Sequence, residues 1–106
     1  MNSHICVRGF KNPKNIKREL ESIASDVQEI IPHASVSIDL EPESKQKQVY
    51  SLAMVVRGLN EDIVITRYDT HIYPMIWKIK KDVIRKIHQH KEKELSHRQK
   101  STEIAS

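Results

Sequence analysis

Four short segments have the hydrophobic pattern of β-strands. The clearest covers residues 34–40, where apolar residues at even positions are separated by serine and aspartate. This period of two is typical of a strand with one buried face. Segments 5–7, 50–56 and 63–66 are also rich in β-branched and apolar residues and are bounded by polar residues or glycine. We therefore expect four strands joined by short polar connections.

A first helix is predicted between the first two strands, because apolar residues recur there at spacings of three and four. Asn12 is a favourable N-cap, and Pro13 is well tolerated as the first helical residue. Pro32 ends the pattern. The apolar stripe consists of Ile16, Leu20, Ile23, Val27 and Ile30.

A second helix is predicted to begin near Asp69 or Thr70, with Pro74 tolerated in its first turn. Trp77 flanks its apolar stripe and is interpreted as packing at the edge of the core, with a stacking platform for a splayed base as the alternative. Lys80 projects inside the apolar arc, where its stem can run out along the rim. Beyond Leu95 no stripe remains to be buried. The stripe consists of Ile72, Ile76, Ile79, Val83 and Ile87.

The element order β-α-β-β-β-α predicts one α+β domain over residues 1–95 and a flexible polar tail over residues 96–106. One dry face per strand implies a four-stranded sheet with both helices packed on a single side. The first helix crosses between strands one and two, so that pair is expected to be parallel and the rest an antiparallel meander. The other face of the sheet would be solvated.

The net positive charge is concentrated at the C-terminal end. Residues 71–100 hold nine Lys and Arg against three acidic residues, or 9 − 3 = +6. Residues 1–70 carry −1 and Glu103 adds −1, which gives the total of +4. A basic helix held on a folded body is an electrostatic footprint for a polyanion.

The order of elements and several residues resemble the ribosome hibernation factors, also called ribosome-associated inhibitors or sigma-54 modulation proteins. Segment 5–10 is similar to the opening strand of that family, and the resemblance spans roughly residues 4–97. Thr70, His71 and Trp77 depart from the family pattern, as do Pro74 and Met75. The last helix follows the pattern at Tyr73, Ile76, Val83, Arg85, Ile87, His90, Lys91, Glu92 and Lys93.

The resemblance implies the short family form, with an arrangement resembling that of double-stranded-RNA-binding domains. It also implies binding to the small ribosomal subunit and its rRNA, in the channel for messenger and transfer RNA. Occupancy there would inhibit translation in stationary phase or under stress, often alongside ribosome dimerisation.

The candidate RNA-binding residues are cations on the two helices. They would contact phosphates and read the shape of the backbone more than the bases. On the first helix, solubility with Glu21 as an i,i+4 partner of Lys17 is an equally good interpretation. The candidates are Lys78, Lys81, Arg85, Lys86, Lys91 and Lys93 on the last helix and Lys14, Lys17 and Arg18 on the first.

Nothing in the sequence indicates catalytic residues, a metal site, a cofactor or a small-molecule substrate. His88 and His90 are two residues apart, so on a helix they point in different directions. Cys6 has no cationic cluster or base partner that the sequence places beside it, and the two glycines cannot form a phosphate loop. A lone cysteine and the absence of a long apolar segment predict a cytoplasmic chain that does not enter a membrane.

Two other functions remain open. The first is a protein–protein adaptor or homodimer that uses the open sheet face, or Trp77 with its neighbours, as its interface, although a monomer is favoured. The second is an RNA-binding domain that acts outside the ribosome.

Overall fold

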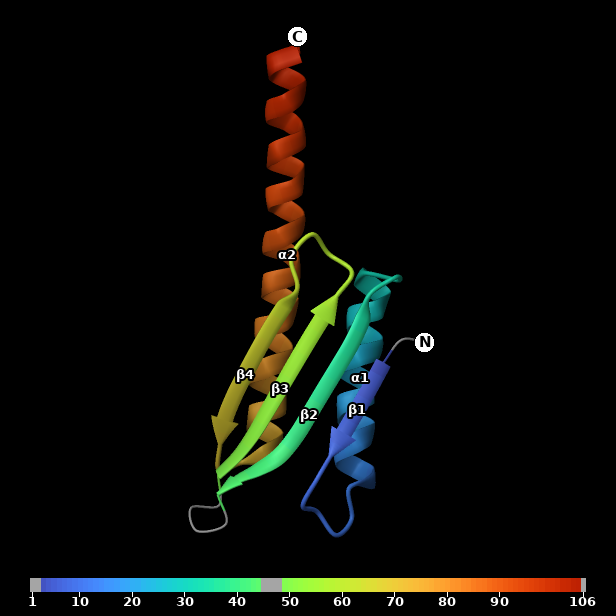
Figure 1. Cartoon of the computed structure of the whole chain (residues 1–106), viewed down its shortest axis with the longest axis vertical. Helices are drawn as coiled ribbons and strands as arrows, with labels where there is room; N and C mark the ends of the chain where they lie inside the picture. Colours follow the sequence, from blue (N-terminus) through green and yellow to red (C-terminus); the bar gives the residue numbers. More distant parts are fainter. Residues whose placement is uncertain (1–2, 45–48, 106) are drawn as a thin grey trace.

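The structure is a computed structural model that describes residues 3–44 and 49–105, with side chains for residues 3–43 and 49–91. The described elements follow the predicted order. Strand β1 (Ser3–Val7) pairs in parallel with β2 (Ser35–Ser44), and β3 (Val49–Arg57) and β4 (Ile63–Asp69) continue the sheet as an antiparallel meander. Helices α1 (Lys14–Ile30) and α2 (Ile72–Ala105) cover one face of this sheet (Figure 1). The α+β fold class is thus confirmed.

The core lies between the sheet and the helix pair. Alternation in β2 turns Val36, Ile38 and Leu40 toward the helices, and each is buried. Their cross-strand partners on β3 are Val56, Met54 and Leu52, also buried. Each such pair stacks two apolar side chains on the same face of the sheet. Helix α1 covers β1 and β2, α2 covers β3 and β4, and the helices touch each other.

Helix α1 begins one residue later than its sequence predicts. Pro13 occupies the N-cap position, and no side chain caps the helix there. The Pro13 carbonyl accepts the first helical hydrogen bond, from the Lys17 amide at 2.8 Å. The prediction of Asn12 as the N-cap is therefore wrong. Proline has no amide hydrogen to leave unpaired, so it is tolerated at this end of a helix.

Helix α2 begins at Ile72, and the His71 carbonyl accepts its first hydrogen bond, so neither Asp69 nor Thr70 is the cap that the sequence predicts. The Asp69 carboxylate accepts the His71 amide at 3.1 Å. Met75, Ile76 and Ile79 are among its buried residues. The helix does not end at Leu95, because its backbone is helical through Ala105 and extends beyond the sheet (Figure 1). The domain limit at residue 95 and the flexibility of residues 96–106 stay predictions. Among the described residues, no helix is long and apolar enough to cross a membrane.

We predict that Ile79→Ala lowers the free energy of unfolding by about 2–5 kcal/mol, since it removes a buried side chain from the contact between α2 and the sheet. Urea denaturation followed by circular dichroism measures this change. His88→Ala, on the exposed side of the same helix, is the control and should stay within about 0.5 kcal/mol of the wild type. Equal effects of the two substitutions would contradict the assignment of the buried face.

Candidate nucleic-acid interface

The cations predicted to bind RNA lie on the exposed surface of α2. Lys78, Lys81, Arg85 and Lys86 are all exposed, while the apolar stripe of the same helix is buried against the sheet and α1. Burial of the stripe fixes the rotation of the helix about its axis. The cations are therefore held outward by the core rather than by contacts of their own. Lys93 lies on α2 outside the range whose side chains are described.

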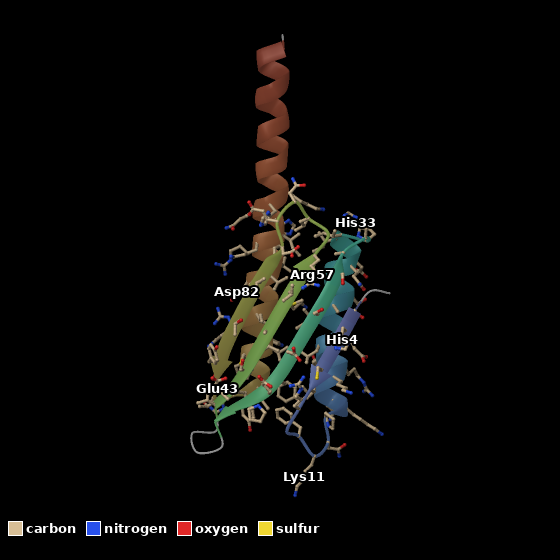
Figure 2. All side chains as sticks on the ribbon, in the orientation of Figure 1. His4, Lys11, His33, Glu43, Arg57 and Asp82 are labelled. Atoms are coloured by element: carbon tan, nitrogen blue, oxygen red, sulfur yellow. The ribbon has the colours of Figure 1, made fainter. Side chains whose placement is uncertain are left out.

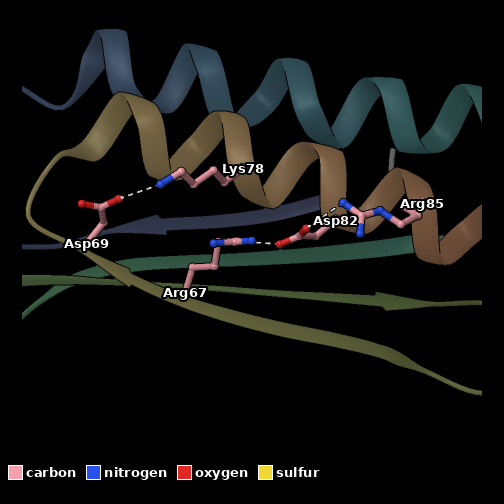
Figure 3. Close-up of polar contacts among 5 residues, drawn as sticks. All are labelled: Arg67, Asp69, Lys78, Asp82 and Arg85. Carbon is pink, nitrogen blue, oxygen red and sulfur yellow. Dashed lines mark hydrogen bonds and ion pairs between the residues drawn. The ribbon is translucent and has the colours of Figure 1, made fainter.

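A row of ionic contacts joins β4 to α2 along one edge of the sheet (Figure 3). Arg67 of β4 donates from Nε to Oδ2 of Asp82 at 2.5 Å. Arg85, one turn further along α2, places a guanidinium nitrogen 3.6 Å from Oδ1 of Asp82. Near the start of the helix, Nζ of Lys78 lies 3.8 Å from Oδ2 of Asp69. These five residues are called the β4–α2 seam below.

Both carboxylates of the seam are held in the charged form. The hydrogen bond from Arg67 is the main cause that lowers the pKa of Asp82 below its ordinary value of 3.8, with help from the charges of Arg85 and Lys86. The pKa of Asp69 is also lowered, first by the hydrogen bond from the His71 amide. At neutral pH each carboxylate is therefore an anion set among cations.

The seam nevertheless has a net positive charge. Its three cations and two carboxylates give 3 − 2 = +1, and Lys86, whose charge acts on Asp82, raises the local sum to +2. The pairs of Lys78 and Arg85 are partly exposed and are 3.6–3.8 Å long. Pairs of this kind contribute about 0–1 kcal/mol to stability. The two cations can thus turn toward a phosphate at small cost.

A shallow hollow of about 380 Å³ opens beside the seam, where β4 forms the free edge of the sheet. The hollow places two basic side chains of α2 next to the backbone of an edge strand, whose outward amide groups lack a strand partner. It is lined by Val64, Ile65, Thr66, Asp82, Arg85, Lys86 and Gln89.

Two candidate cations of α1 lie beside the other edge of the sheet. Lys14, Lys17 and Arg18 share one face of α1 by their i, i+3, i+4 spacing. Lys17 and Arg18 line a second hollow, about 500 Å³, together with residues of β1. Because β1 and β4 are the opposite edges of the described sheet, the structure does not bring Lys17 and Arg18 together with Arg85 and Lys86. Figure 2 shows this separation, with His4 of β1 at one edge and Asp82 at the other.

The ion pair that the sequence offers between Lys17 and Glu21 does not form. Glu21 lines the same hollow as Lys17, yet the two described side chains form no ion pair.

Two other cations of α2 make contacts inside the molecule. Nζ of Lys80 lies 3.2 Å from Oδ2 of Asp26 on α1, so this residue projects inside the apolar arc, as predicted, and reaches across to the neighbouring helix. Nζ of Lys91 donates to the carbonyl of Ile30 at 3.2 Å. A cation at the C-terminal end of a helix donates to a free carbonyl and interacts favourably with the negative end of the helix dipole. Lys91, a predicted phosphate contact, therefore also holds α2 against the end of α1.

Within the described residues, Cys6 has a single cation beside it. It lies on the open face of the sheet, opposite Ile5 and Val7, as predicted. Nε of Arg8 donates to the Cys6 sulfur at 3.3 Å. This hydrogen bond raises the pKa of the Arg8 guanidinium. Side chains two apart on a strand share a face, so the contact follows from the strand geometry. Among the described residues no group of three His, Cys, Asp or Glu side chains is arranged to hold a metal ion.

The aromatic residues fall into two groups. Tyr50 stacks on Phe10 with ring centroids 5.4 Å apart, in keeping with a packing role. Trp77, however, is 68% exposed and Tyr68 is 61% exposed. The interpretation of Trp77 as a core-edge residue is therefore wrong. The sequence places Trp77 next to the apolar stripe, but its position on the helix leaves the side chain outside the contacts of α2 with the sheet and with α1.

The arrangement of these elements defines a known class of fold. A four-stranded mixed sheet in the order β-α-β-β-β-α is covered on one face by two helices. A solved structure with a similar fold is the N-terminal domain of Protein Y from Thermus thermophilus. The match covers 80% of this chain and 98% of that domain, with a TM-score of 0.57 and 13% sequence identity. No family profile and no curated protein matches the sequence.

The resemblance expected from the sequence is thus confirmed at the level of the fold. At this identity the likeness concerns the fold alone, and the roles of individual residues have to come from the structure of this chain.

We predict that Asp82→Asn lowers the free energy of unfolding at pH 7 by about 1–2 kcal/mol, because Arg67 loses a charged hydrogen-bond partner. The carboxylate stabilises the fold above its unfolded pKa, near 3.8. This contribution is lost as the pH falls through the lower pKa of the folded state. The difference between wild type and variant should therefore shrink below about pH 4.

Urea denaturation at pH 7 and at pH 3 measures both effects. The control is Asp62→Asn, which removes an exposed pair with Arg57 at 3.8 Å and should leave stability unchanged. A stability difference between wild type and Asp82→Asn that is the same at both pH values would show that the Asp82 charge is not what matters.

Proposed function

We propose that this protein binds the small ribosomal subunit in its messenger and transfer RNA channel and inhibits translation by occupying it, as a cytoplasmic hibernation factor of stationary phase or stress. The observation that carries the proposal is the exposed row of cations on α2, held outward by a buried stripe on a fold shared with Protein Y. The mechanism requires no bond to be made or broken. It therefore needs neither a catalytic group nor a cofactor.

The binding physics is that of phosphate neutralisation. Each Lys or Arg that meets a phosphate releases condensed counterions, so affinity falls steeply as salt is added. Lys81 and Lys86 are exposed and form no ion pair with a described residue. Lys78 and Arg85 would leave their weak ion pairs within the seam and each bind a phosphate instead. Charges carried on one rigid helix meet a structured RNA without a large ordering cost.

A partner that reaches both edges of the sheet can use the largest number of these cations. Arg85 and Lys86 lie beside the β4 edge, and Lys17 and Arg18 lie beside the β1 edge. A partner with RNA on several sides can contact Lys17 and Arg18 while it also contacts α2. This distinguishes the proposal from the alternative of an RNA-binding domain that works on free duplexes.

A second candidate is an adaptor or homodimer that uses the open sheet face. It is favoured by Val64 and Tyr68, which are 60% and 61% exposed on that face. Light scattering at low and high salt separates the two functions. Self-association that resists salt would support the adaptor or homodimer, whereas a monomer that joins ribosomal subunits only at low salt supports the first proposal.

We expect reversal of three α2 cations, Lys78→Glu, Lys81→Glu and Arg85→Glu together, to abolish co-sedimentation with small ribosomal subunits at low salt. Three attractive contacts with phosphates become repulsive. Wild-type protein should co-sediment at about 50 mM salt and be released progressively toward several hundred millimolar.

The matched control reverses Arg8, Lys11 and Arg57, which changes the net charge equally but leaves α2 intact (Figure 2). It should retain most of the binding. Equal loss in both triple variants would mean that overall charge, and not the α2 surface, governs binding. Retained binding in the α2 variant would show that the footprint lies elsewhere.

We expect Lys17→Glu with Arg18→Glu to weaken binding to small subunits by more than about tenfold, but to change binding to a short free RNA duplex by less than about threefold. The duplex occupies α2 alone, while the channel also reaches α1. Fluorescence anisotropy of the labelled protein measures both affinities. Equal effects on the two partners would argue against the channel.

A further inference from the structure

Two aromatic rings stand on the outer surface of α2, where the core makes no use of them. Trp77 is 68% exposed and Tyr73, one turn earlier, is 50% exposed. Residues four apart lie next to each other along one face of a helix. The two rings therefore form a short aromatic strip at the beginning of the helix. Large exposed aromatic surfaces are costly to leave in water and usually mark a binding site.

Cations surround this strip. Lys81 follows Trp77 by one further turn on the same face, and Lys78 is the next residue after Trp77. Both lysines are exposed, and Lys78 makes a 3.8 Å contact with Asp69. An aromatic ring beside exposed ammonium groups matches a ligand that has a flat apolar face and an adjoining negative charge. A nucleotide has both, in its base and its phosphate.

The exposed residues of the open sheet face have different surroundings. Val64 and Tyr68 belong to β4, and the same face carries Asp39 and Glu41 on β2 together with Arg8, which lies 3.6 Å from Glu41. Opposite charges offset each other there, so this face attracts a polyanion less than the lysines of α2 do. Charge therefore favours the strip on α2 over Tyr68 as the place where RNA would meet an aromatic ring.

We propose that Trp77, with Tyr73 beside it, is a stacking platform for unpaired bases of RNA, while Lys78 and Lys81 bind the adjoining phosphates. The inference rests on the proposed function and refines it. The stretch of RNA that faces the start of α2 is single-stranded or contains a looped-out base, and the rest of α2 lies along phosphates of structured RNA. An RNA duplex keeps its bases inside the stack and leaves the platform empty.

Trp77 is the single tryptophan of the chain, so its fluorescence reports on this site alone. The test titrates the protein with a single-stranded oligouridine and, separately, with a blunt RNA duplex of equal length. Binding is followed by anisotropy of the labelled RNA and stacking by quenching of tryptophan emission. We expect both RNAs to bind at low salt, with quenching by the single strand and little quenching by the duplex.

Substitution provides a second measurement. Trp77→Ala should weaken binding of the single strand by about fivefold to a hundredfold, the range that a stacked base contributes. Binding of the duplex should change by less than about twofold. Tyr68→Ala removes an aromatic side chain of similar exposure from the open sheet face and is the matched control. It should change neither affinity.

The outcomes separate this inference from the proposed function. If both RNAs bind but the single strand does not quench Trp77, and Trp77→Ala leaves its affinity intact, the platform is refuted while RNA binding by α2 stands. If neither these RNAs nor the small subunit bind, both proposals fall, and the strip is then a contact for an acidic protein. Quenching by the single strand with loss of affinity in Trp77→Ala supports the platform.

Discussion

The burial of one apolar stripe on α2 is the interaction on which the rest of the structure depends. Residues such as Ile76, Ile79 and Val83 have almost no exposed surface, and they hold the helix across β3 and β4. Because the stripe fixes how the helix is rotated, it also decides which residues face water. The cations and Trp77 are outward as a consequence of hydrophobic packing, so the surface that contacts a partner needs little further ordering.

Most of the fold could be predicted from the sequence. Apolar residues recur at a regular spacing in each strand or helix that buries only one of its faces. The alternation through Val36, Ile38 and Leu40 and the helical spacing through Ile79 and Val83 each have one consistent solution. The parallel pairing of β1 with β2 followed from the crossover helix between them. The N-terminal end of α1 was placed one residue early, since Asn12 and Pro13 are both acceptable at a helix start.

The candidate site could be predicted only in part, because it depends on distances between elements. The sequence indicates which cations are outward on α2, but not that Arg67 of β4 reaches Asp82. Nor does it show that Lys17 and Lys86 face opposite edges of the sheet. The exposure of Trp77 was missed because a large aromatic next to an apolar stripe is usually packed. How far α1 and β4 cover that side of the helix is a property of the assembled fold.

The most direct test of the central claim counts the phosphates that the α2 surface neutralises. The affinity for small ribosomal subunits would be measured over a range of salt for the wild type and for Lys81→Gln, a change at an exposed side chain. The logarithm of the affinity should fall linearly with the logarithm of the salt concentration, and the substitution should reduce the slope by about one. An unchanged slope, or binding that does not depend on salt, would contradict the account.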